Sequence, residues 1–332
     1  MSFLHCEFGF LAMLLLIAPA IEAHHSHSIY DLENEIRLEG VVTSFQWTYP
    51  HVYIEVETAD GDDRRAWTVE ASPPAGLSGR GWSASSLVSG DRVMITANPA
   101  RNLERRHVLG ISVIKDDGSL LSLSGNEPTA PSRFVATDLF GHWVTRTDSE
   151  MVERFFDPLS AWSLTEGGVA AIESYDDSSM NPSIECVPEP VPSEMLFPSV
   201  HRIELNEDTI TILAEANERT IHMNLESHDG APYSYQGHSI GRWEESVLVV
   251  DTRNFLEHRR GNAWGLPSSP QRHLIERFGL NEDGVSFSYT FRVEDPAYLA
   301  EPITGALELV YRPDLPFVRE PCDPQVARRF FE

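Results

Sequence analysis

The sequence predicts an all-β protein built from a small OB-like five-stranded barrel and a larger antiparallel, lipocalin-like eight-stranded barrel, with short helices before the second barrel. Three observations support this fold class. Short β-rich segments recur between Gly, Asp and Asn turns, and residues 116–137 form a Gly-, Ser- and Pro-rich break. Near the C-terminus, Val285, Phe287, Tyr289, Phe291 and Val293 alternate with polar residues. At 332 residues the chain can hold two domains, each with its own core.

The N-terminal residues 1–23 have the pattern of a signal peptide. Phe8 to Ile21 is an apolar run of 14 residues, shorter than the roughly 20 that a membrane span needs. Small residues end it, so cleavage after Ala20 and cleavage after Ala23 are both open. We therefore expect an exported protein, periplasmic or extracellular, with no membrane span in the mature chain.

Charge and cysteine content narrow the partners and the compartment. The formal net charge of −26 opposes binding to phosphate backbones, so nucleic acid is excluded as an expected partner. After removal of the signal peptide, Cys186 and Cys322 remain. In an oxidising compartment they can form a disulfide, although two separate thiols also fit the sequence.

Residues 24–115 are expected to form the small barrel. Five β-rich segments supply its strands, and Asp60-Gly61-Asp62 and Ser89-Gly90-Asp91 supply turns. The expected strands are 35–47, 52–58, 64–71, 92–98 and 108–115. Residues 116–137 are expected to be a linker.

Residues 138–332 are expected to form the larger barrel. Short helices are predicted over 151–156 and 169–175, the second of them started by Thr165. The expected strands are 201–205, 209–215, 219–225, 238–243, 247–252, 272–280, 285–293 and 305–312. Eight sequential antiparallel strands close most simply into an up-and-down barrel that can enclose one small ligand.

One stretch matches a catalytic pattern that we set aside. Gly237 to Gly241 fits G-x-S-x-G, the nucleophile elbow of serine hydrolases, which requires a helix directly after the serine. Val247 to Val250 instead continues as a β-branched strand. We interpret the stretch as a hairpin that turns at Glu244 to Ser246.

The histidines near the N-terminus are candidate metal ligands. His24, His25 and His27 lie close together, and His51 follows Pro50 at the start of an expected strand. If cleavage leaves His24 at the N-terminus, its amine and imidazole form a chelating pair suited to copper, and His25 and His51 offer further nitrogens. Incidental histidines at an exposed terminus are the alternative.

A second group of candidates lies in the larger barrel. His222, His238 and His273, together with Arg277, are candidate catalytic residues if the protein is an enzyme, because imidazoles transfer protons near neutral pH. Several such groups projecting into an apolar barrel would form a site. His222 shares its strand face with polar neighbours and also fits a solvent-facing position. The candidate ligand-binding residues are Arg242, Trp243 and Tyr289, and Asp251 is a further charged neighbour.

The chain also resembles two domains of unknown function found in exported bacterial proteins. The first resemblance rests on His24-His25-Ser26 and on Trp47-Thr48-Tyr49-Pro50-His51, where Tyr49 replaces the Asn of the usual W-T-N-P-H motif. The second rests on the segment Gly237 to Glu244 and on His273 to Phe278. Pro267-Ser268-Ser269 departs from the Pro-His-Ser common in that second domain. The resemblance implies export and a two-domain chain, and it implies no activity.

These observations predict a binding protein for a metal ion, a small hydrophobic ligand, or both. One alternative is a barrel enzyme that uses histidines for proton transfer, as a hydratase or isomerase does. The other alternative is a non-catalytic interaction module of the cell envelope.

Overall fold

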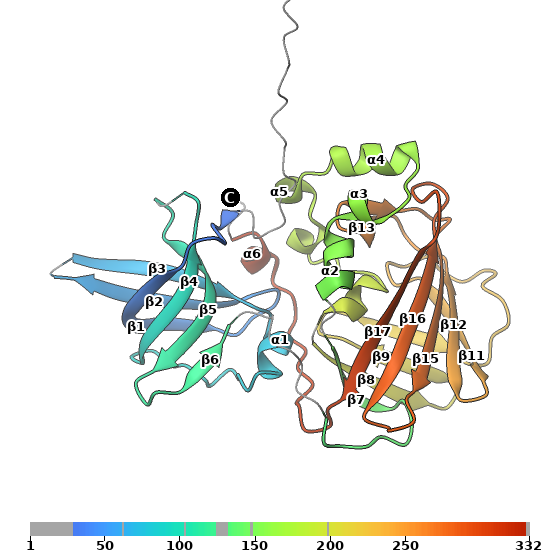
Figure 1. Cartoon of the computed structure of the whole chain (residues 1–332), viewed down its shortest axis with the longest axis horizontal. Helices are drawn as coiled ribbons and strands as arrows, with labels where there is room; N and C mark the ends of the chain where they lie inside the picture. The colour runs from blue at the N-terminus through green and yellow to red at the C-terminus, as the bar shows by residue number, and fades with distance from the viewer. Residues whose placement is uncertain are drawn as a thin grey trace, which may run out of the picture.

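The computed structural model describes residues 29–61, 63–102, 104–123, 132–146, 149–197 and 199–329. Two β-barrels lie side by side, and the C-terminal segment runs between them (Figure 1). The expected signal peptide and the candidate ligands His24 and His25 lie outside the described residues. Within the described part of the chain, no helix is long and apolar enough to cross a membrane.

The first barrel has the predicted five strands. They are β1 (Ile36–Gln46), β2 (Val52–Asp60), β3 (Asp63–Ala71), β4 (Arg92–Pro99) and β5 (His107–Lys115). The sheet runs β3-β2-β1-β4-β5, and a parallel pairing of β3 with β5 closes it, which is the Greek-key closure of an OB-like barrel. A short helix, α1 (Pro74–Ser78), connects β3 to β4. A short strand, β6 (Leu120–Ser122), pairs with β5 inside the segment predicted as a linker.

Alternation of apolar and polar residues places one face of each of these strands in the core. Val42, Ile54, Val69 and Ile95 are fully buried together. A glycine is required in β1, because a Cβ at Gly40 would lie 2.4 Å from the carbonyl oxygen of Glu57 on β2. The strands β1 and β2 therefore approach each other closely.

The second barrel has nine strands rather than eight. They are β7 (Gly141–Thr145), β8 (Val200–Asn206), β9 (Thr209–Leu213), β10 (Glu218–His222), β11 (His238–Glu244), β12 (Val247–Arg253), β15 (His273–Leu280), β16 (Ser286–Glu294) and β17 (Ile303–Tyr311). All eight expected strands are present, and β7, which was not predicted, closes the barrel between β17 and β8. A hairpin of β13 (His258–Ala263) and β14 (Leu266–Ser268) forms a separate two-stranded sheet.

The expectation of purely antiparallel neighbours is wrong at one place, because β10 and β11 pair in parallel. Parallel strands need a long connection that returns the chain to the same end, and residues 223–237 provide it. The predicted hairpin of β11 and β12 is confirmed, with Glu244 paired to Val247 across the turn.

The short helices expected before the second barrel instead lie between its strands β7 and β8 in the chain, and they lie at one end of the barrel (Figure 1). They are α2 (Ser149–Phe156), α3 (Pro158–Ala161), α4 (Glu166–Glu173), α5 (Asp177–Met180) and the 3-10 turns η2 (Pro182–Glu185) and η3 (Ser193–Leu196). The start predicted for α4 is confirmed, since the Thr165 hydroxyl accepts a hydrogen bond from the N–H of Gly168. Met151 and Phe155 of α2 are buried in the core of the barrel.

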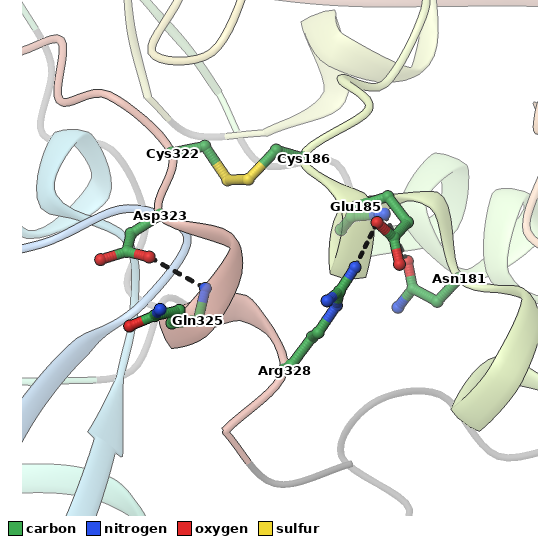
Figure 2. The surroundings of a disulfide bond; sticks show 8 residues. Asn181, Glu185, Cys186, Cys322, Asp323, Gln325 and Arg328 are labelled. Atoms are coloured by element: carbon green, nitrogen blue, oxygen red, sulfur yellow. Dashed lines mark hydrogen bonds and ion pairs between the residues drawn. A yellow bond between two sulfur atoms is a disulfide. The ribbon is translucent and has the colours of Figure 1, made fainter. Parts of the chain in front are cut away.

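A disulfide ties the C-terminal segment to the helical region (Figure 2). Cys186 and Cys322 are bonded, with their Cα atoms 5.8 Å apart. Beyond Cys322 the short helix α6 (Pro324–Ala327) begins, capped by Asp323, whose carboxylate accepts from the N–H of Gln325. Arg329 then donates hydrogen bonds to Gln46 and Glu55 of the first barrel. The segment therefore connects both barrels.

Candidate functional site

His51 is the described member of the predicted metal-ligand set. It precedes β2, and its side chain is 29% exposed. Its Nδ1 lies 3.3 Å from the carbonyl oxygen of Ala71 and 3.3 Å from a carboxylate oxygen of Glu70. Since both partners accept hydrogen bonds, Nδ1 carries the proton and Nε2 has the lone pair that can bind a metal.

The carboxylate of Glu70 also binds Tyr30, which is near the first described residue. Tyr30 is fully buried, and its hydroxyl donates to the second oxygen of Glu70 at 2.5 Å. Burial and the charge of Glu70 raise the pKa of Tyr30 far above its ordinary value, so the phenol remains a donor. His107 packs edge-on against the Tyr30 ring at 5.4 Å, and burial lowers its pKa. Glu70 therefore joins Tyr30 and His51.

Among the residues that the structure describes, no three His, Cys, Asp or Glu side chains converge on a possible metal position. His51 alone represents the predicted set there, since His24 and His25 fall outside.

The histidines of the second barrel lie on its outer wall. His238 and His273 alternate with buried Ser239 and Leu274, and His222 follows buried Ile221. The expectation that these imidazoles project into the barrel is therefore wrong. The solvent-facing alternative noted for His222 applies to all three.

Two further residues join these histidines into one group. Asp251 of β12 lies 3.1 Å from Nε2 of His273 and 3.1 Å from Nε2 of His228, a residue in the β10–β11 connection. Nδ1 of His228 lies 2.9 Å from Nδ1 of His238. The ring of His222 stacks on that of His238 at 5.0 Å. We call His222, His228, His238, His273 and Asp251 the outer histidine cluster.

Charge and burial set the protonation tendencies of this cluster. Burial, followed by the neighbouring His222 and His228, lowers the pKa of His238. Partial burial raises the pKa of Asp251, but hydrogen bonding and charge from His273, with contributions from Arg253 and His228, outweigh it, so the net pKa is lowered. Asp251 is therefore an anion beside two imidazoles, and His238 is a neutral imidazole at neutral pH.

His228 is the member of this cluster that sequence patterns miss. It lies in an irregular connection, so no strand periodicity marks it. Its position depends on Asn254, which donates hydrogen bonds to the carbonyl oxygens of His228 and Ala231. These contacts, rather than a strand periodicity, bring it to Asp251.

The other predicted residues do not join this cluster. Arg242 and Arg277 both pair with Glu244, at 2.8 and 2.9 Å, on the outer surface. Trp243 lies at the end of β11 with 45% of its surface exposed. Tyr289 is buried inside the barrel. The three candidate ligand-binding residues, Arg242, Trp243 and Tyr289, therefore do not converge.

The barrel interior contains a closed polar network. Arg219 of β10 makes a bidentate ion pair with Glu276 of β15, and both side chains are almost completely buried. Arg219 also donates to Ser239 at 3.0 Å and to Thr252 at 2.7 Å. The hydroxyl of Tyr289 donates to Glu276 at 2.8 Å.

Aromatic side chains fill the space around this network. Phe278 packs against Tyr289 at 4.9 Å and against Phe287 at 6.0 Å, and Trp143 packs against Phe287 at 4.7 Å. All four side chains are fully buried. The inward-facing positions at this level of the barrel are thus occupied by the protein itself.

Comparison with known proteins gives one finding. Residues 13–109 match the model of a family of unknown function, DUF6152. The match includes His24, His25 and His51 and ends within β5, so the second barrel lies outside it. Curated proteins and solved structures give no match.

Proposed function

We propose that this chain is an exported binding protein. It holds a transition-metal ion, for which copper is the first candidate, on the first barrel through His24, His25 and His51. The observation that carries the proposal is the shared contact of Tyr30 and His51 with Glu70. We also propose that the second barrel is a further domain of unknown function fused to the first barrel. The Gly237 to Glu244 segment marks this second domain.

Chain length supports this assignment. Tyr30 is held at the carboxylate that also holds His51, and it follows His27 by three residues and His24 by six. An extended chain covers about 3.3–3.6 Å per residue, so these spans reach at most about 11 and 22 Å. The N-terminal histidines are therefore tethered to Tyr30, which shares the Glu70 carboxylate with His51.

The contacts of His51 also fit a metal ligand. Histidines that bind metals usually donate the second ring N–H to a carboxylate or carbonyl, which fixes the tautomer and the ring orientation. The Nδ1 contacts of His51 with Glu70 and Ala71 have this form. If signal-peptide cleavage leaves His24 at the N-terminus, its amine and imidazole add a chelating pair. If cleavage falls after Ala20, His24 is not the N-terminal residue, so the chelating amine is lost and the imidazole remains.

Two features support export. Residues 1–23 have the signal-peptide pattern, and the disulfide between Cys186 and Cys322 suits an oxidising compartment such as the periplasm.

We restrict the proposal to a metal. A lipocalin-like use of the second barrel, with a hydrophobic ligand inside, would require the buried Arg219–Glu276 pair and the aromatic side chains around it to move apart. Separating a buried ion pair is costly, because each charge loses its partner in a medium of low dielectric constant.

The test is intact-mass and metal analysis of untagged protein exported from cells, followed by copper titration. We expect one equivalent of copper, lost in His24→Ala and in His51→Ala. His142→Ala is the matched control, because its half-buried Nδ1 also bonds a carbonyl oxygen, that of Leu315, in the other barrel. His238→Ala tests the outer histidine cluster and should retain the copper. A protein that takes up no copper, or that loses it equally in the controls, would refute the proposal.

A further inference from the structure

Four members of the outer histidine cluster, all except His222, form a continuous hydrogen-bonded chain across four neighbouring segments. It runs from His273 on β15 to Asp251 on β12, then to His228 in the β10–β11 connection, and ends at His238 on β11. The side chains are half-buried, and the chain lies on the outside of a wall whose inner side is closed.

Arg253 at one end of the chain and Asp251 within it fix where the protons lie. Arg253 can only donate, and its guanidinium contacts Nδ1 of His273 at 3.2 Å, so Nε2 of His273 carries the hydrogen and donates to Asp251. The carboxylate of Asp251 can only accept, so Nε2 of His228 also carries a hydrogen.

The contact between His228 and His238 then has a single direction. With Nε2 of His228 protonated, Nδ1 of the neutral ring has the lone pair, and the 2.9 Å contact is a hydrogen bond donated by Nδ1–H of His238. Nε2 of His238 is therefore left unprotonated, which makes it the basic end of the chain.

We propose that His238 is the base of a proton relay that removes a proton from a small organic acid or carbonyl compound bound at the outer wall. The bond between hydrogen and the acidic atom of the substrate, X, breaks. The electron pair of this bond stays on X, and the proton binds Nε2 of His238. The Nδ1 proton of His238 moves to Nδ1 of His228, and the resulting imidazolium is stabilised by Asp251. Return of the proton along the same path releases an isomer or an exchanged product, without a change of oxidation state.

The neighbours of His238 favour this direction of transfer. Burial and the nearby His222 and His228 disfavour a positive charge on His238, whereas His228 contacts the anionic Asp251. The proton that leaves His238 therefore moves toward the carboxylate of Asp251.

Arg253 indicates the substrate class. It is paired with His238 in the β11–β12 register, and its side chain is 50% exposed. Directly opposed residues on antiparallel strands have Cβ atoms about 5 Å apart. A carboxylate or enolate oxygen could therefore bind Arg253 while His238 removes a proton from the same small molecule.

Two measurements on the full chain test the relay. Imidazole nitrogen NMR at about pH 7.5 should show His238 as the Nδ1–H tautomer and His228 as the Nε2–H tautomer. Acylation by diethyl pyrocarbonate, followed by peptide mass analysis, should be rapid at His238 in the wild-type protein. In Asp251→Asn, the rate of His238 acylation should fall about tenfold or more. Glu294→Gln is the matched control. A carboxylate oxygen of Glu294 lies 3.8 Å from Nδ1 of His273, but Glu294 is not part of the hydrogen-bonded chain, so this variant should change neither result. An Nε2–H tautomer at His238, or equal acylation in Asp251→Asn, would overturn the relay.

The substrate class is tested with pyruvate, which carries a carboxylate beside an acidic methyl group. We expect the protein to catalyse deuterium exchange of this methyl group in heavy water, and we expect His238→Asn to abolish the exchange. Absence of exchange with wild-type protein would overturn the assigned substrate class. The proposal of copper binding at the first barrel does not depend on either result, because the two sites share no residue.

Discussion

Replacing Glu276 by Gln should strongly destabilise the second barrel. Arg219 donates to both carboxylate oxygens of Glu276 and to Ser239 and Thr252. Both members of the pair are nearly inaccessible, with side-chain exposures of 3% and 0%. In Glu276→Gln the guanidinium keeps its charge without a counter-ion, and the new amide N–H group faces other donors.

The expected loss follows from measurements on buried ion pairs. Removing one partner typically costs about 3–5 kcal/mol, because the remaining charge is uncompensated. For a domain of this size, each kcal/mol lowers Tm by about 2–4 °C, so Tm should fall by about 6–20 °C. Urea denaturation followed by tryptophan fluorescence would measure the free energy of unfolding, and calorimetry would measure Tm.

Glu244→Gln is the matched control. It also removes a carboxylate bound to arginine, but Glu244, Arg242 and Arg277 are 41–58% exposed, so solvent screens their attraction and the loss of stability should be small. If Glu276→Gln were no more destabilising than Glu244→Gln, the interior network would not be the closed, tightly paired unit described above. The barrel interior could then open to admit a ligand.

Two further changes test the junction of the barrels. Replacing Cys186 and Cys322 by Ser opens a loop of 136 positions and should cost about 4–5 kcal/mol on the chain-entropy model, and a loss under about 1 kcal/mol in urea denaturation would contradict this. Burial raises the pKa of Glu215 from 4.5 to about 8 although it accepts from the N–H of Ala75, so its contribution to stability is full below pH 4.5 and is lost as pH rises to about 8. Glu215→Gln keeps the acceptor and should lose less stability than wild type between about pH 5 and pH 8, whereas exposed Glu218→Gln should follow wild type.

The strand pattern could be predicted from the sequence because it depends on local alternation. The apolar face of β16, from Phe287 to Val293, is inside the barrel as expected. The strand β7 could not be predicted in the same way. It has five residues, and it becomes a strand only because β17 and β8 pair with it on both sides.

The histidine positions show where local alternation fails. On β15, one face carries His273, Ile275 and Arg277, and the other carries Leu274, Glu276 and Phe278. Each face holds apolar and charged residues, so hydrophobicity alone does not decide which one is buried. The buried face is the one whose charge, on Glu276, is matched by Arg219. Arg219 is 57 positions away in the sequence, and that pairing is invisible until the strands are in register.

The two faces of the wall formed by β11 and β12 consequently have different roles. Adjacent residues point to opposite sides: Thr252 contacts Arg219 inside, and Asp251 contacts His228 outside. The inner group is closed by bidentate pairing and full burial, so a change there should appear in stability. The outer group is half-buried and ends in an imidazole with a free lone pair, so a change there should appear in acid–base behaviour. A Thr252→Val variant should therefore destabilise the barrel while leaving the rate of His238 acylation unchanged per folded molecule. Asp251→Asn should slow the acylation of His238 while leaving the stability of the barrel largely unchanged.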